Sequence, residues 1–255
     1  MAGARPPPPL TYEQASRVLA KLADLPVVLV GGQAVSFWAS YYAKRVATPA
    51  TAHTSKDIDF IGSRVAVEES ARRLHGTAKV ATIDDANTPN TGVVVFVDED
   101  GYERQIDFLD AVAGVRDSYY ESIEAEIVDE RAATVATLHV MDPLTCLKAR
   151  AHNVAHLPGY QGEHALGQLR AAIACAKEFG RDLLAQDPRA ALKSNEHVFD
   201  IAEYDPGPVV FVRYGIDVLE AVVDDPGLPA KFYSERLPRV RALVERARAR
   251  AAPKA

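Results

Sequence analysis

Three aspartates in strand-like surroundings are the residues of this chain best suited to chemistry. Asp57 and Asp59 stand one residue apart in the run SKDIDF, and Asp107 lies in the later run QIDFL. Because side chains alternate along a strand, Asp57 and Asp59 are expected on one face of it. Aspartate is depleted in strands, so two on one face need an explanation, and carboxylate oxygens suit Mg²⁺. The pattern therefore predicts a metal site for phosphoryl or nucleotidyl transfer.

Three carboxylates can hold two Mg²⁺ ions. One ion would activate an attacking hydroxyl, and the other would neutralise a triphosphate and its leaving pyrophosphate. Asp107 is also a candidate general base for that hydroxyl. The competing interpretation is a pair of solvent-facing aspartates on an edge strand. The apolar neighbours Ile58 and Phe60 favour an interior strand instead.

A glycine pair stands between a short apolar strand, expected over 27–30, and a helix expected over 33–45. At Gly31 and Gly32 a phosphate could approach the backbone, where a helix N-terminus offers free N–H donors. The same pair is also typical of a strand-to-helix turn that needs only a positive φ, so both interpretations stay open. Neither a Rossmann glycine fingerprint nor a Walker lysine accompanies it.

The remaining periodicity divides the chain into a mixed half and a helical half. Residues 1–10 are proline-rich and expected to be disordered, and Thr11 with Gln14 predicts a capping box. Beyond a helix over 63–75, the predicted strands are 77–83, 91–98, 102–109, 124–129 and 134–140, and the predicted helices are 142–156, 163–186, 190–203, 212–223 and 229–251. We therefore expect an α+β fold, with a catalytic domain over 11–141 and a helical domain over 142–255.

Composition narrows the class of protein. The 255 residues are 48% apolar with a formal net charge of -6, which excludes a surface that is basic throughout. No signal peptide or membrane-length apolar run is evident, so we expect a cytoplasmic protein without membrane contact. Cys146 and Cys175 are expected to be buried thiols. The C-terminal arginines predict a solvated helix face that also permits an RNA or acidic-partner contact.

These residues together resemble the nucleotidyltransferase superfamily that shares the DNA polymerase β catalytic fold, and within it the AbiEii-type toxin group. The matches are Gly31 to Ala34 (GGQA), Ser55 to Asp59 (SKDID), the late Asp107, and Pro143 to Lys148 (PLTCLK). The resemblance implies a nucleotidyltransferase-type mixed sheet with flanking helices, followed by an α-helical domain.

The resemblance also implies roles for single residues. Asp57, Asp59 and Asp107 would bind the metals, and the nucleotide-binding residues would be Gly31, Gly32, Gln33, Ser55 and Lys148. Gln33 stands where the family usually has a serine, and the connection from Gly32 to Asp57 is longer than the family norm. These departures bear on the choice of NTP and on the toxin assignment, and they leave the aspartates in place.

The function expected from the resemblance is Mg²⁺-dependent transfer of an NMP from an NTP to a hydroxyl of tRNA or protein. A toxin–antitoxin or phage-defence role follows, with an antitoxin protein as a candidate partner. Two alternatives remain open at this point. One is a small-molecule nucleotidyltransferase of the aminoglycoside-modifying kind, and the other is a binding protein that keeps the fold without catalysis.

Overall fold

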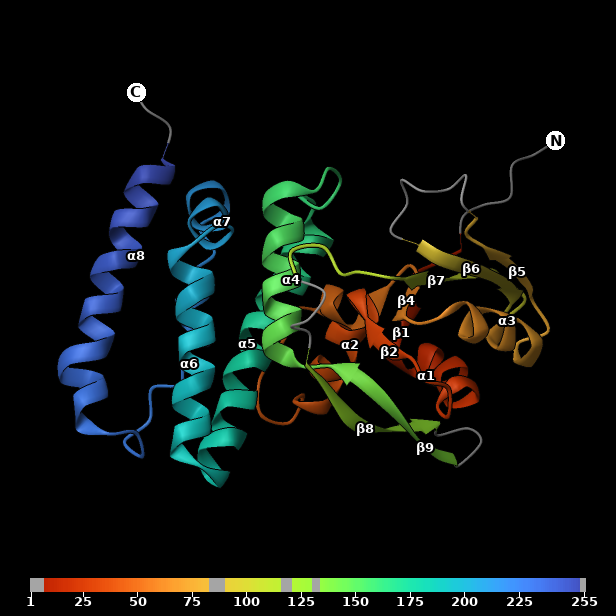
Figure 1. Cartoon of the computed structure of the whole chain (residues 1–255), viewed down its shortest axis with the longest axis horizontal. Coiled ribbons are helices and arrows are strands. Elements are labelled where there is room, and N and C mark those ends of the chain that lie inside the picture. The colour runs from red at the N-terminus through yellow and green to blue at the C-terminus, as the bar shows by residue number, and fades with distance from the viewer. Residues whose placement is uncertain (1–6, 83–89, 116–120, 130–133, 253–255) are drawn as a thin grey trace. The chain divides into compact units, whose positions relative to one another are not determined.

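The computed structural model describes residues 7–82, 90–115, 121–129 and 134–252 (Figure 1). This is a mixed α/β protein: the described residues form eight α-helices, a seven-stranded mixed sheet and a two-stranded sheet. The chain divides into two compact units, residues 1–40 with 52–142 and residues 41–51 with 143–255. Within the described ranges, none of the helices has both the length and the apolar character that crossing a membrane requires.

The large sheet forms the first unit and has the strand order β5, β6, β7, β4, β2, β9, β8. In that order the strands are Thr77–Val80, Asn90–Val97, Glu103–Leu109, Ile58–Ile61, Val28–Val30, Thr134–Met141 and Ser122–Asp129. The pairs β4–β7 and β2–β9 are parallel, and the other neighbouring pairs are antiparallel. The parallel pair β4–β7 therefore lies in the middle of the sheet, as the apolar sequence around Asp59 predicted.

One face of this sheet is covered by two helices. α1 (Tyr12–Leu22) packs on β8 and β9, and α3 (Arg64–Arg73) packs on β5 and β6. The strand residues beneath them are buried, among them Phe60 and Ile106 in the central strands. Alternation along β4 and β7 places Asp59 and Asp107 on the opposite face, where their side chains are half-buried. The two carboxylates thus lie on the face opposite α1 and α3, which also carries the buried side chains of Val30 and Met141.

The N-terminal part of the chain is more ordered than expected. The predicted capping box is confirmed, because Thr11 Oγ1 accepts from the Gln14 N–H at 3.2 Å and Gln14 Oε1 accepts from the Thr11 N–H at 3.0 Å. The predicted disorder of residues 1–10 is wrong at Leu10, which is buried and forms β1 (Leu10–Thr11) with the partner strand β3 (Thr54–Ser55). Residues 1–6 lie outside the described part of the chain.

The helix after the glycine pair differs from its predicted range. α2 (Gly31–Tyr41) begins at the first glycine and ends four residues before the expected end at 45. The chain beyond it, 41–51, belongs to the second unit. There Tyr42 donates a hydrogen bond to Asp182 at 2.9 Å, and Arg45 forms an ion pair with Glu178 at 2.8 Å. This docking explains the length of the connection between Gly32 and Asp57.

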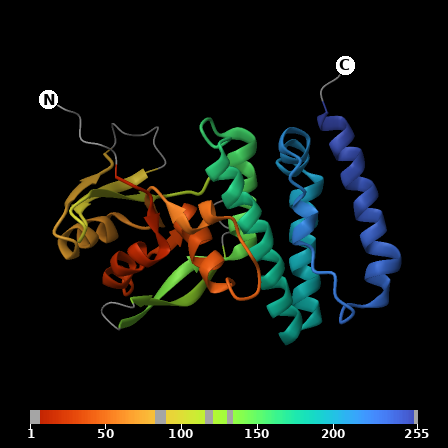
Figure 2. The ribbon, with the colours of Figure 1, turned by 180° about the vertical axis from the view of Figure 1, so that it is seen from behind.

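The second unit is built from helices throughout its described residues. α4 (Pro143–His156) packs on α5 (Glu163–Gln186), α5 packs on α6 (Pro188–Glu203), and α6 packs on α8 (Leu237–Ala251), as Figures 1 and 2 show. The first three of these helices match their predicted ranges closely. Cys146 and Cys175 are buried thiols, as expected, on α4 and α5.

The helix predicted over 212–223 is wrong. α7 (Gly207–Tyr214) ends at Gly215, whose φ of +64° is the left-handed conformation that terminates helices. A separate 3₁₀ turn, Val218–Ala221, follows it. The helix predicted over 229–251 begins instead as a π-helical turn, Phe232–Arg236, and continues as α8.

Candidate active site

Two of the three predicted aspartates are direct neighbours across strands. In the parallel pairing of β4 with β7, Asp59 is the register partner of Asp107, just as Ile58 is the partner of Ile106. Adjacent strands lie about 4.8 Å apart, and partners in register project to the same face. The half-buried carboxylates of Asp59 and Asp107 therefore stand side by side on the sheet face opposite α1 and α3.

The third aspartate lies next to this pair but not in the strand. β4 begins at Ile58, and Asp57 occupies the bend before it with an exposed side chain. The predicted strand placement of Asp57 is therefore wrong by one residue. The two residues that precede the bend pair with β1, since Leu10 is the partner of Ser55. The small sheet consequently holds the backbone just before Asp57.

The surroundings of Asp57 and Asp107 disfavour their charged forms. Although the Asp57 side chain is exposed, the protein around it partly desolvates the carboxylate and raises its pKa; the negative charge of Asp107 raises the pKa further, and Lys56 lowers it. Burial also raises the pKa of Asp107, which the Gln105 amide, donating at 2.8 Å, partly offsets. Carboxylates that share a partly dry region repel one another, and a cation between them would relieve that repulsion. Perturbed acids of this kind are frequent at functional sites.

Gly31 explains how Asp59 fits against the start of α2. The residue has a φ of +67°, and a Cβ atom added there would stand 1.9 Å from Asp59 Oδ2. The carboxylate thus occupies the space of the missing side chain, beside the N-terminal end of a helix whose dipole favours negative charge. The positive φ predicted as one reading of the glycine pair is confirmed at Gly31. Phosphate binding by the pair stays a prediction.

Two other predicted nucleotide contacts are buried. Gln33 has no exposed surface, and its Nε2 donates to the Leu10 carbonyl oxygen at 3.4 Å. Its Oε1 has no hydrogen-bond partner among the described residues. Ser55 is buried in β3. The observed contact gives Gln33 a structural role, because its amide holds β1 near α2.

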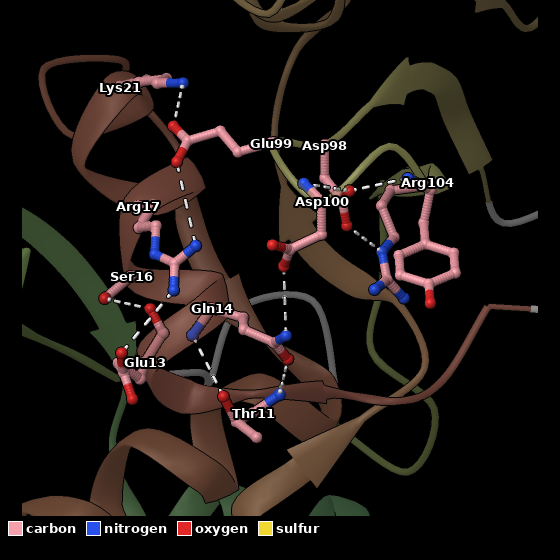
Figure 3. Close-up of polar contacts among 11 residues, drawn as sticks. Thr11, Glu13, Gln14, Ser16, Arg17, Lys21, Asp98, Glu99, Asp100 and Arg104 are labelled. Atoms are coloured by element: carbon pink, nitrogen blue, oxygen red, sulfur yellow. Dashed lines mark hydrogen bonds and ion pairs between the residues drawn. The ribbon is translucent and has the colours of Figure 1, made fainter. Parts of the chain in front are cut away.

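The start of β7 is anchored to α1 by a polar network that the sequence did not suggest (Figure 3). Glu99, in the turn between β6 and β7, accepts from Lys21 Nζ at 3.2 Å and lies 3.8 Å from Arg17. Gln14 Nε2 donates to Asp100 in the same turn at 3.4 Å. α1 therefore fixes the turn that leads into the strand bearing Asp107.

A buried ion pair completes this network at the first residues of β7. Arg104 donates from Nε to Asp98 Oδ2 at 2.6 Å, and its side chain is 1% exposed. Asp98 also accepts from the N–H groups of Asp100 and Tyr102, at 3.0 and 2.8 Å. Residues 98–101 form the hairpin turn between β6 and β7, with Gly101 at a φ of +83°. These residues act on Asp107 only through the position of its strand.

Lys148 lies on the exposed side of α4, in the second unit. Its contact with a triphosphate stays a prediction. On the same helix the rings of His152 and His156 lie tilted against each other with centroids 4.9 Å apart, and His156 Nε2 pairs with Asp205 at 2.8 Å. Burial and the neighbouring His156 lower the pKa of His152.

The aspartates offer a donor set that fits magnesium. Hard cations such as Mg²⁺ prefer oxygen ligands, and the carboxylates of Asp57, Asp59 and Asp107 would supply oxygen alone. Asp59 and Asp107 are neighbours across strands, and the charge of Asp107 acts on Asp57. Among the residues that the structure describes, no three His, Cys, Asp or Glu side chains stand in an arrangement that could hold a metal ion. Binding by all three aspartates therefore requires their side chains to turn toward one centre; β4 and β7 position Asp59 and Asp107, and the bend before β4 positions Asp57.

Comparison with known proteins does not assign the chain to a family. A scan against protein-family models finds no match to the chain, and a search of curated proteins finds no similar sequence.

Proposed function

We propose that this protein is a Mg²⁺-dependent nucleotidyltransferase with a nucleotidyltransferase-type catalytic sheet. The observation that carries the proposal is the register of Asp59 with Asp107 on adjacent parallel strands. Gly31 supports it, because the start of α2 stands against the same carboxylate. Two in-register carboxylates beside a helix N-terminus provide metal ligands and an anion-binding backbone within one small region.

Each group has a defined task in this proposal. Asp59 and Asp107, with Asp57 from the adjoining bend, hold the cation. Bound Mg²⁺ would supply charge neutralisation at the triphosphate and activation of the attacking hydroxyl. The first N–H groups of α2, at Gly31 and Gly32, orient phosphate oxygens. Lys148 remains a proposed phosphate contact from the helical unit.

The acceptor is proposed to carry a hydroxyl, on tRNA or on a protein, with a toxin role and an antitoxin as the corresponding partner. A second candidate is a small-molecule acceptor. The first unit has a groove of about 610 Å³, lined in part by the end of α1 and residues 23–26 and by none of the three aspartates. The groove is lined in part by Glu124 and His139, which are cross-strand partners on β8 and β9. Through β2 and β4, the strand register places His139 on the sheet face of Asp59.

The proposal is tested by supplying each α-³²P-labelled NTP with Mg²⁺ and separate pools of RNA, protein and small molecules. We expect label to enter one pool with the wild-type protein, and transfer to fall at least about a thousandfold in Asp59→Asn and Asp107→Asn. Asp110→Asn is the matched control, because Asp110 is an exposed aspartate just beyond the same strand. It should retain wild-type transfer.

The same experiment separates the alternatives. Label in a small molecule would select the second candidate over tRNA or protein. Undiminished transfer by Asp59→Asn would refute the assigned metal site. If the folded wild-type protein labels no pool and calorimetry detects no Mg²⁺-dependent NTP binding, a binding protein without catalysis replaces the proposal.

A further inference from the structure

The C-terminal part of the helical unit differs in charge from the rest of the chain. Residues 231–251 contain seven Lys or Arg and two Glu, although the chain as a whole has a formal net charge of -6. Such an asymmetry concentrates positive potential on one element and is typical of a surface that meets an acidic partner. The structure shows how these charges are distributed.

Three of the arginines form a row along α8. Arg239, Arg246 and Arg250 are seven and four residues apart, so they lie within about 20° of one line on the helix, at rises of about 10 and 6 Å. All three are exposed, and none pairs with a carboxylate among the described residues. Arg248 differs, because it is buried and bound to Asp217 and Glu245. The charges of the arginine row are therefore not paired with carboxylates in the described chain, although Arg246 Nε donates to the Ala242 carbonyl oxygen at 3.1 Å, whereas Arg248 stabilises the fold.

An apolar groove of about 310 Å³ begins where the arginine row begins. Leu192 of α6, Pro229 and Phe232 line it. Its charged lining residues are one carboxylate, Glu235, and three cations, Lys231, Arg236 and Arg239. Lys231 is exposed and, like Arg239, forms no ion pair within the described chain. The groove has room for one bulky apolar side chain. The arginine row extends from the edge of the groove along α8.

The base of this groove is held in place by packing. Phe232 is 3% exposed and stacks against Phe199 at 6.2 Å. Arg236 lies over the Phe199 ring at 5.5 Å, and Glu196 accepts from its Nε at 2.8 Å. A groove with a packed base and exposed cationic side chains at its edge resembles an anchor pocket in peptide recognition.

We propose that the groove and the arginine row bind an acidic peptide segment that carries one bulky apolar side chain. The apolar side chain would enter the groove beside Phe232, and its flanking carboxylates would pair with Arg239, Arg246 and Arg250. Single-stranded RNA fits less well, because it needs exposed aromatic faces for base stacking and the groove aromatic Phe232 is buried. This inference stands independently of nucleotidyl transfer.

The test uses the full-length protein and a fluorescein-labelled, glutamate-rich peptide of about fifteen residues with a single central Leu. Anisotropy should report saturable binding that weakens as salt rises, because the contacts are exposed ion pairs. Replacing the central Leu by Ala should weaken binding about tenfold, since the apolar anchor is lost. A fluorescein-labelled uridine oligonucleotide of equal charge should bind at least tenfold more weakly than the Leu peptide.

Two surface variants test the assignment without disturbing the fold. The double variant Arg239→Glu/Arg246→Glu and the groove variant Leu192→Asp should each weaken peptide binding at least about tenfold. Arg170→Glu is the matched control, because Arg170 is an exposed arginine on α5 with no ion pair in the described chain. Circular dichroism should show unchanged helicity in all three.

Three results would overturn the proposal. The first is equal binding of the Leu and Ala peptides, which would remove the anchor. The second is tighter binding of the oligonucleotide, which would make the row a nucleic-acid surface. The third is binding by Arg239→Glu/Arg246→Glu equal to that of Arg170→Glu.

Discussion

The carboxylate of Asp59 occupies the space that a side chain at Gly31 would fill. A Cβ atom at Gly31 would stand 1.9 Å from Asp59 Oδ2, and the residue also has a φ of +67°. Glycine is therefore required here for two separable reasons, a left-handed backbone and the close approach of a carboxylate. The second reason ties the beginning of α2 to the strand that pairs with Asp107.

We predict that Gly31→Ala lowers the free energy of unfolding by about 3 kcal/mol or more. The left-handed φ accounts for about 1–2 kcal/mol of this, and the clash with Asp59 supplies the rest. Urea denaturation measures the loss. Gly215→Ala is the control, because Gly215 has a φ of +64° with no atom within 4 Å of an added Cβ. Equal losses in the two variants would contradict the role of the carboxylate.

A second prediction concerns the repulsion between carboxylates. Burial first, and then the charge of Asp107, raise the pKa of Asp57, so the charged pair is a local cost to the folded protein. Asp107→Asn should leave the free energy of unfolding in EDTA unchanged or raise it by up to about 1 kcal/mol. It should also abolish the rise in melting temperature that saturating Mg²⁺ gives the wild type.

Thermal denaturation with and without Mg²⁺ makes this comparison. Asp110→Asn, which changes an exposed aspartate outside the pair, should keep the Mg²⁺ effect. Two outcomes would contradict a metal site at Asp107. One is a wild-type melting temperature that does not change with Mg²⁺, and the other is an Asp107→Asn variant that shows the full wild-type increase.

Local sequence predicted the site more accurately than its surroundings. Alternation of apolar and polar residues located β7, and with it Asp107, because a half-buried strand repeats every two residues. The same rule placed Asp57 one residue too far into β4. The bend before Ile58 arises from the pairing of Ser55 with Leu10, a contact across more than forty residues that a local pattern does not contain.

Distant contacts also account for the other differences. The segment after α2 docks on α5 through Tyr42 and Arg45, whose partners Asp182 and Glu178 follow more than 130 residues later. Gln33 was predicted to be a nucleotide contact because of its place in a motif. Its burial depends on β1, formed by a tail that composition alone marked as disordered. Sequence periodicity predicts which face of an element is apolar, but it does not predict which distant element packs against that face.

A third prediction follows from the ion pair at the start of β7. Burial raises the pKa of Asp98, but the Arg104 guanidinium and the N–H groups of Tyr102 and Asp100 outweigh this and hold it below its usual value of 3.8. A depressed pKa stabilises the fold above the unfolded-state value, and the effect is lost as the pH falls through the folded-state pKa. Asp98→Asn should therefore cost about 3 kcal/mol at pH 7, since it leaves Arg104 buried without its counter-charge.

Urea unfolding, measured at pH values from 7 downward, tests whether the stabilisation by the Asp98 carboxylate is lost as the pH falls. The difference between Asp98→Asn and wild type should shrink as the pH falls below about 3.8. Glu103→Gln is a control on the same strand, because Glu103 is exposed and its loss should change stability by at most about 0.5 kcal/mol. A difference that stays constant down to low pH would assign the loss to packing instead of charge.

The last prediction concerns the thiols, which test the packing of the helical unit. Cys146 and Cys175 are 2% and 1% exposed, and burial, followed by the charge of Glu178, raises the pKa of Cys175 to about 12. The reactive thiolate is therefore both inaccessible and scarce at pH 8. A disulfide reagent such as dithionitrobenzoate should modify neither thiol in the native protein, and both in guanidinium chloride. Native modification should be slower by at least about a thousandfold, because it requires opening of the core. Rapid native labelling of Cys175 would show that α5 opens locally, and the packing of α5 against α6 would then be weaker than its burial implies.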